Sequence, residues 1–171
     1  MHETPEDLIA LQSLIDSSYA AAGAHLLAIH DPERRLSAEQ VSERLTGMCL
    51  LTLATVTRDC RPIAGPVDGI FFRGAFHFGS ADNSVRFRHI RARPQVSATY
   101  LPGEELAVTV HGRAAPIDIA APEHAGFRQA VLDVYIPIYG KGWEQEFLEA
   151  VSPVYARIDA ARMFTFSMPA S

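Results

Sequence analysis

Apolar residues recur at helical spacing near the start of the chain. Thr4 is typical of an N-cap and Pro5 of a first helical position, and the apolar positions that follow are Leu8, Leu11, Leu14 and Ile15. Gly23 is expected to interrupt this helix. A second start signal follows at Ser37–Gln40, where the serine and glutamine can form a capping box. The pattern therefore predicts a helical segment over residues 1–47, ending at Gly47.

From Met48 onward the pattern becomes typical of strands. Short runs rich in β-branched and aromatic residues alternate with turn residues, at 49–57, 63–72, 75–79, 95–101, 105–117 and 155–168. Pro66 interrupts the second run and predicts a bulge or a sheet edge, because proline has no N–H for the ladder. Short helices are expected at 80–93, 122–133 and 143–150.

These elements define the expected fold class. Short strands joined by tight turns favour an antiparallel barrel or sandwich over alternating strands and helices. We expect a mainly β (α+β) protein in a single domain, with a helical extension at 1–47 packed on the β-rich part at 48–171.

Composition narrows the functional classes. The net charge of −5 argues against a dedicated nucleic-acid binder, although Arg86, Arg88, Arg91 and Arg93 cluster on one segment. We expect neither a nucleic-acid partner nor a membrane partner, since the apolar runs are far shorter than the ~20 residues that cross a bilayer. The acidic start does not look like a signal peptide, and two cysteines fit a reducing compartment, so a cytoplasmic protein is expected.

No nucleotide-binding glycine loop, nucleophile elbow or paired histidine motif is present, and no metal site is expected. Cys60 lies in a predicted hairpin without a nearby sequence partner, and is interpreted as a bystander.

The informative stretch is 76–90, where a strand passes into a helix that carries Ser80, Ser84, Arg86 and Arg88. Hydroxyl groups, a guanidinium and the N–H groups of a helix start suit a phosphate, whereas the alternative is a capped surface helix with solvated arginines.

An ordered set of motifs resembles the FMN-binding split-barrel superfamily typified by pyridoxamine 5'-phosphate oxidase. The set spans about two thirds of the chain. It consists of Ala54-Thr55-Val56, Arg61-Pro62, Pro66-Val67, Phe78-Gly79-Ser80, Ser84-Val85-Arg86 and Arg93-Pro94, with later matches at 111–114, 155–158 and 163–164. The resemblance implies a six-stranded antiparallel split β-barrel with N-terminal helices and short helices between strands.

The resemblance also implies a site. Ser80, Ser84 and Arg86, with Val85 in the same motif and Arg88 as a second basic residue, would hold the phosphate of FMN. Backbone groups of Pro66, Val67 and Asp68 would contact the isoalloxazine ring. Members of the superfamily are homodimers with the flavin between subunits. Second-half residues that could complete the site are His111, Tyr135 and Trp143.

Two departures separate this chain from the oxidase. Gly65 stands where the oxidase has an arginine, and the closing substrate motif of the oxidase is missing. Arg86 also replaces a lysine that is common in the superfamily. The resemblance therefore implies an FMN-dependent oxidoreductase acting on an unidentified small molecule. Two alternatives stay open: a reductase using 8-hydroxy-5-deazaflavin, whose anionic tail Arg86 and Arg88 would suit, and a non-enzymatic flavin-binding or haem-binding protein.

Overall fold

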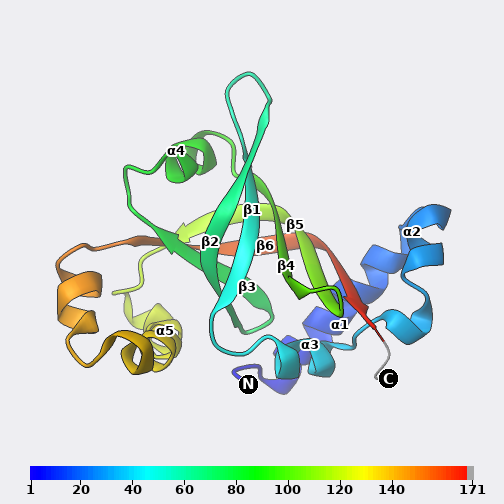
Figure 1. Ribbon diagram of the computed structural model, residues 1–171, viewed down its shortest axis with the longest axis horizontal. Coiled ribbons are helices and arrows are strands. Elements are labelled where there is room, and N and C mark those ends of the chain that lie inside the picture. The colour runs from blue at the N-terminus through cyan, green and yellow to red at the C-terminus, as the bar shows by residue number, and fades with distance from the viewer. Residues whose placement is uncertain (169–171) are drawn as a thin grey trace.

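Six antiparallel strands close into a barrel in the computed structural model, which describes residues 1–168 (Figure 1). The predicted segment 48–171 thus extends three residues past the described part. Around the barrel the order is β1-β2-β3-β6-β5-β4. The strands are β1 (Cys49–Val56), β2 (Pro62–Phe72), β3 (Ala75–Ser80), β4 (Gln95–Gly103), β5 (Leu106–Ile117) and β6 (Val154–Ser167). The expected split-barrel fold is confirmed.

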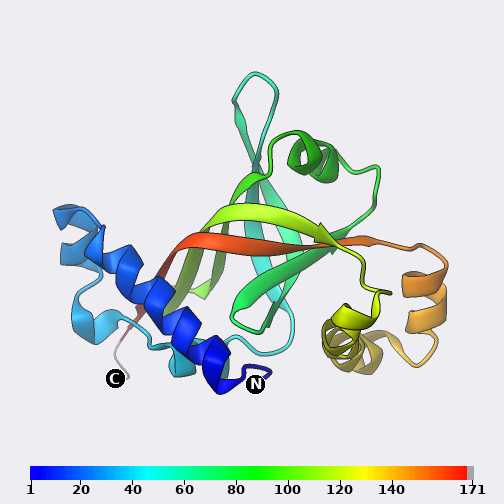
Figure 2. The same ribbon diagram turned by 180° about the vertical axis from the view of Figure 1, so that it is seen from behind.

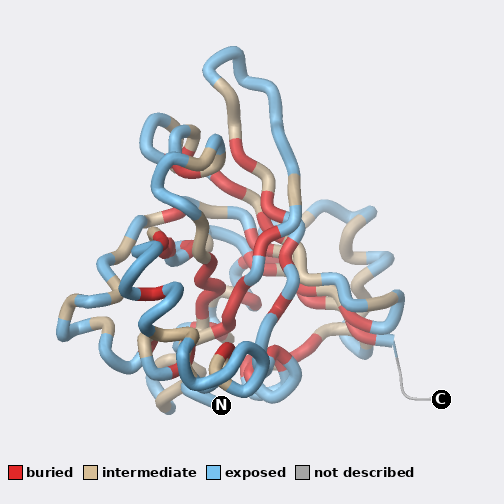
Figure 3. Tube along the Cα trace, turned by 60° about the vertical axis from the view of Figure 1, so that its left-hand side comes forward, coloured by how far each residue is buried: buried red, intermediate tan, exposed pale blue. Residues whose placement is uncertain are grey.

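Alternation along the strands separates the core from the outer surface. In β1, Leu51 and Leu53 are buried inside the barrel, whereas Leu50 and Thr52 face outward. Figure 3 shows the buried stretches gathered along the strands, while the β1–β2 hairpin projects as an exposed loop. The closed barrel leaves its interior filled with side chains, so binding sites lie on its flanks.

The N-terminal helices cover one side of the barrel (Figure 2). They are α1 (Pro5–Ala20), α2 (Ala24–Ile29), the 3-10 turn η1 (Pro32–Arg34) and α3 (Ala38–Arg44). Both expected caps are present, at Thr4 and Ser37, and each is a capping box. The Tyr19 hydroxyl fastens α1 to β6, since it donates to the Thr165 carbonyl at 2.6 Å and accepts from the Thr165 N–H at 3.0 Å.

The remaining helices lie in the connections between barrel strands. Helix α4 (Val85–Ala92) lies between β3 and β4, and begins five residues later than predicted because Ala81–Ser84 forms a turn closed by Ser84 N–H. The turn η2 (Pro122–His124), helix α5 (Ala125–Tyr139) and the π-helix η3 (Glu144–Glu149) lie between β5 and β6.

Helix α5 and η3 lie on the opposite side of the barrel from the N-terminal helices (Figures 1 and 2). Helix α5 continues past the predicted end at residue 133, because Pro137 falls in its last turn and removes only one helical N–H donor. Together with β2 and β6 these helices enclose a second small core. No helix in residues 1–168 has the length and apolar character needed to cross a membrane.

Candidate functional site

The first half of β2 has a free edge, and this edge organises the site. β2 pairs with β1 from Pro62 to Gly69, but with β3 only from Gly69 to Phe72. The β1–β2 register runs without a shift through Pro66, opposite Thr52. Of the two predictions for Pro66, the edge is therefore correct and the bulge is not.

Arg86 binds this free edge. Its Nη2 donates to the Pro66 carbonyl at 2.8 Å, so the backbone groups of Pro66 point away from β1. Backbone N–H and C=O groups of successive residues point to opposite sides of a strand, so the backbone groups of Asp68 also point to the free edge, while the backbone groups of Val67 point to β1. The Arg86 guanidinium is half-buried, and burial lowers its pKa. It lies over Gly65, where an added Cβ would be 3.7 Å from Nη2. The guanidinium is therefore at van der Waals distance from the space that a Cβ at residue 65 would occupy.

A cavity of about 240 Å³ lies between β1, β2 and the start of α4. Ser84 caps α4 by accepting from the Phe87 N–H at 3.2 Å, and its carbonyl accepts from the Arg88 N–H. The N–H groups of Val85 and Arg86 remain without helical partners. Within residues 1–168, Arg86 is the only charged lining residue; the lining consists of Leu53, Thr55, Ile63, Ala64, Gly65, Ser84, Val85 and Arg86. This chemistry favours an anion.

The other arginines of this segment do not join Arg86. Arg88 is exposed and lies two residues along α4, so the two side chains leave the helix in different directions. Arg91 binds the carbonyl and carboxylate of Asp82, and Arg93 donates to the Val56 carbonyl at 3.0 Å. The structure thus brings Ser84, Val85 and Arg86 together at Pro66, and leaves Arg88 apart.

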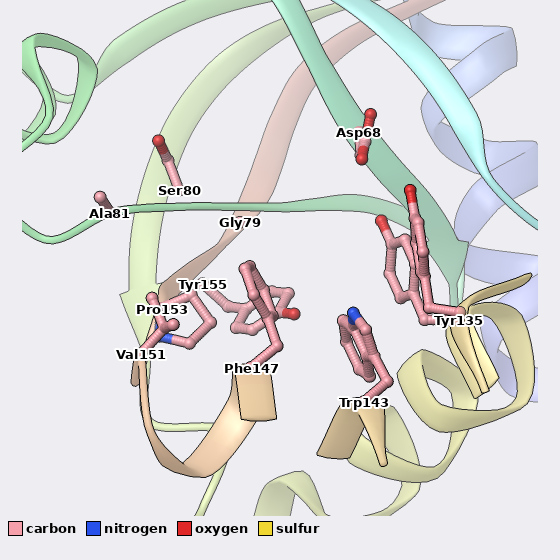
Figure 4. A pocket seen from close by; sticks show the side chains of 11 residues that line it. Asp68, Gly79, Ser80, Ala81, Tyr135, Trp143, Phe147, Val151, Pro153 and Tyr155 are labelled. Carbon is pink, nitrogen blue, oxygen red and sulfur yellow. The ribbon is translucent and has the colours of Figure 1, made fainter. Parts of the chain in front are cut away.

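A second cavity, of about 410 Å³, lies on the α5 side of β2 and β3 (Figure 4). Two of the predicted residues, Asp68 and Ser80, line it. Val67, in contrast, is 7% exposed and belongs to the barrel core. The complete lining is Asp68, Gly79, Ser80, Ala81, Tyr135, Tyr139, Trp143, Phe147, Val151, Pro153 and Tyr155. We call it the aromatic cavity.

Four aromatic rings form one wall of this cavity. Trp143 stacks on Tyr135 with ring centroids 4.7 Å apart, and on Phe147 with centroids 5.2 Å apart. Tyr139 lies 6.1 Å from Tyr135, and all these rings are within about 25° of parallel. The wall comes from the end of α5 and from η3.

Polar atoms of the aromatic cavity face β2. Figure 4 shows the Tyr135 hydroxyl and the Trp143 nitrogen pointing to the side where Asp68 lies. Burial, followed by the negative charge of Asp68, raises the pKa of Tyr135; the same two causes raise the pKa of Tyr155 to about 12. Both phenols therefore stay protonated at neutral pH. The Tyr155 ring packs on Gly79, where a Cβ would lie 2.8 Å from Cε1.

Sequence reasoning identified only part of this wall. Tyr135 and Trp143 were candidates, whereas Tyr139 and Phe147 were missed, as was Tyr155 elsewhere in the cavity lining. A signal was available, because the four wall residues follow one another at intervals of four along the sequence. The third candidate, His111, lies elsewhere: its Nδ1 is 2.8 Å from Ser97 Oγ on the outer face of β4 and β5.

The two cysteines and the potential metal ligands are dispersed in the part of the chain that is described. Residues 1–168 contain no group of three or more His, Cys, Asp or Glu side chains placed to hold a metal ion. Cys49 is buried, which raises its pKa to about 11, and Cys60 is exposed and unpaired with Cys49. The role of Cys60 as a bystander stays a prediction.

Solved structures with the same fold have diverse ligands. A conserved hypothetical protein from Mycobacterium tuberculosis matches at TM-score 0.67 and 20% identity, over 82% of this chain and 93% of its own. A FAD-binding protein from Mesorhizobium loti matches at TM-score 0.56 and 22% identity, over 80% and 98%. A heme storage protein from Vibrio cholerae matches at TM-score 0.58 and 14% identity, over 80% and 94%.

The same fold occurs in an F420 reductase and in a putative pyridoxamine 5'-phosphate oxidase from Listeria innocua, at TM-scores of 0.53 and 0.54. No family model matches the chain, and no curated protein matches it. The likeness establishes a split-barrel fold that other proteins use to bind flavins or haem.

Proposed function

We propose that this protein is an FMN-dependent oxidoreductase acting on a small molecule. The observation that carries the proposal is the half-buried Arg86 guanidinium, held by the Pro66 carbonyl at the mouth of a cavity without carboxylates. An arginine has five N–H donors, and this bond uses one of them. The others, with the N–H groups of Val85 and Arg86 and the Ser84 hydroxyl, would bind the phosphate of FMN.

The isoalloxazine ring would lie along the free edge of β2. Asp68 directs its N–H and carbonyl to this edge, where both would form hydrogen bonds with the ring, and Pro66 offers the second lone pair of the carbonyl that accepts from Arg86. Val67 would support the ring from the core. Ser80 lies at the far end of the edge, in the aromatic cavity. FMN would supply the transfer of a hydride or electrons, and the protein would bind, orient and shield the reactants.

A homodimer is part of the proposal. The outer face of the barrel carries two rows of outward residues across β2, β1, β4 and β5, and neither row contains a charged side chain. The rows are Pro66, Thr52, Thr99 and Thr109, and Ala64, Ala54, Ser97 and His111. A solvated sheet face usually bears charges, whereas the core of an interface is depleted of them. A second copy packed here would place His111 near the partner's flavin.

Two alternatives use the same cavities. A deazaflavin reductase is supported by the fold shared with the F420 reductase, but Arg88 does not face the cavity of Arg86. A haem-binding role is supported by the fold of the heme storage protein. For haem, the iron ligands offered by the lining residues of the two cavities would be tyrosines, since His, Cys and Met are not among them.

Titration of the purified protein with each cofactor tests the proposal. We expect FMN fluorescence to be quenched at a stoichiometry of one per chain, with weaker binding of the deazaflavin and of haem. Photoreduction of the bound FMN followed by rapid mixing with candidate acceptors would then test oxidoreductase activity. Failure of FMN to bind at micromolar protein, with tight binding of either other cofactor, would replace the proposal by the matching alternative.

A further inference from the structure

Among the residues that the structure describes, Asp68 is the only charged one that lines the aromatic cavity. It is exposed on β2, and no ion pair involves it within residues 1–168. The rest of the lining is aromatic, aliphatic or uncharged polar. A carboxylate beside an apolar wall gives the cavity a negative end and a hydrophobic end.

We propose that the aromatic cavity binds an aromatic amine in its protonated form, with the ammonium group at Asp68 and the ring against the wall of Tyr135, Trp143 and Phe147. An ammonium group has only N–H donors. The cavity offers it acceptors, namely the Asp68 carboxylate and the hydroxyl oxygens of Tyr135 and Tyr155. The nearly parallel rings of the wall favour a flat apolar body.

The cavity is poorly suited to an anionic group. Among residues 1–168, no lysine, arginine or histidine lines it, whereas the cavity at residues 63–65 of β2 contains Arg86 and no carboxylate. The two cavities thus meet β2 at successive positions, the positive one at residues 63–65 and the negative one at Asp68. A phosphate-bearing ligand would bind in the first, and a cationic ligand in the second.

This inference depends in part on the proposed function. The amine can be the substrate only if FMN lies along the edge between the two cavities. The binding of the amine does not require FMN, because Asp68 and the aromatic wall are present without a cofactor. The two claims can therefore fail separately.

The sole tryptophan of the chain, Trp143, reports directly on the cavity. Its fluorescence can be followed during titration with 2-phenylethylamine and with 2-phenylethanol, which has the same ring and chain length but no charge. At pH 7.5 we expect the amine to bind about fivefold more tightly than the alcohol, the upper range for a charge pair at an exposed site. Added salt should reduce this preference.

Asp68→Asn tests the carboxylate, and Asp133→Asn is the matched control, because Asp133 is an exposed carboxylate on α5 that binds only Gln129. We expect the preference for the amine to disappear in D68N and to persist in D133N. Equal binding of amine and alcohol to the wild-type protein would overturn the proposal, as would an unchanged preference in D68N.

A parallel FMN titration, followed by flavin fluorescence, separates the two claims. Amine binding without FMN binding would retain the cation site and overturn the proposed function. FMN binding without an amine preference would retain the proposed function and overturn the cation site.

Discussion

The Arg86 guanidinium donates to the carbonyl of Pro66 at 2.8 Å and so connects the start of α4 to the free edge of β2. The two residues lie 20 positions apart in sequence, on either side of the hairpin that joins β2 to β3. A proline is tolerated at this edge because its missing N–H would have faced away from β1. The carbonyl holds one N–H of the guanidinium, and the remaining donors stay available for a phosphate.

Arg86→Ala is therefore expected to weaken FMN binding by about 10- to 100-fold, which corresponds to ~1.5–3 kcal/mol for hydrogen bonds to a charged group. Arg86→Lys should cause a smaller loss, because it keeps the charge without the fork. The dissociation constant from flavin fluorescence quenching measures both effects. Arg58→Ala is the control, since Arg58 is exposed in the β1–β2 hairpin. Equal affinities in wild-type and R86A proteins would contradict the proposed phosphate site.

Ala54→Glu should convert the proposed dimer to a monomer. Ala54 faces outward in the uncharged row, between Ala64 and Ser97 of the neighbouring strands, so a carboxylate there would be buried in the interface without a partner. Sedimentation velocity would show the change in mass. Ile9→Glu, on an exposed position of α1, should leave the mass unchanged. A dimer that persists in A54E at low micromolar concentration would exclude this face as the interface.

His77 should make the stability of the protein depend on pH. It is 5% exposed and stacks on Phe127, and burial, opposed by a hydrogen bond to the Ala75 carbonyl, lowers its pKa to about 3. Between about pH 6.5 and pH 3 the unfolded chain therefore binds one more proton at this residue than the folded chain does. Its contribution to stability is complete above pH 6.5 and is lost as the pH falls.

Urea denaturation at several pH values would measure this effect. The free energy of unfolding should fall by up to ~1.4 kcal/mol per pH unit below pH 6 because of His77 alone. His77→Gln should reduce the slope, although it also loses the stacking. His25→Gln, at an exposed position, should retain the wild-type slope. The same slope in H77Q and in the wild-type protein would contradict the assignment.

Much of the fold was predictable because local signals agreed with the tertiary structure. Thr4 and Ser37 cap helices as expected, and the six predicted strands all occur. The boundaries were less accurate where tertiary contacts decide them. Helix α5 was predicted to end at residue 133 but extends to Tyr139. The extra turns place Tyr135 in the second core, a tertiary contact that local sequence does not reveal.

The two halves of the site differed in predictability. The motif Ser84-Val85-Arg86 is contiguous, so its place at the start of α4 follows from local sequence. The aromatic cavity combines residues from β2, β3, α5, η3 and β6, and only the closed barrel brings Asp68 to the wall around Trp143. The four wall residues are spaced four apart in the sequence, but this spacing continues past the end of α5 at Gly140. Helical periodicity alone therefore would not predict that the residues on either side of Gly140 share a face.

Gly79 offers a test of how closely the aromatic cavity is packed. A Cβ at this position would lie 2.8 Å from Cε1 of Tyr155, a ring that is 5% exposed and cannot turn away without disturbing Phe127, its edge-to-face neighbour at 5.6 Å. Gly79→Ala should therefore destabilise the protein by ~1–3 kcal/mol, the usual cost of forcing an extra methyl group into a packed site. The displaced tyrosine should also alter the emission of Trp143 and weaken the binding of 2-phenylethylamine.

Gly23→Ala is the matched control for this substitution. Gly23 precedes α2 at a φ of −74°, and a Cβ there would meet no atom within 4 Å, so its effect on stability should be limited to the roughly 0.5–1 kcal/mol lost when alanine replaces glycine at a helix N-cap. Urea denaturation compares the two variants directly. Similar stabilities of G79A and G23A would mean that the Tyr155 ring moves freely in solution. In that case Tyr155 could not help to fix the orientation of a bound ring, which would then depend on the aromatic wall and on Asp68.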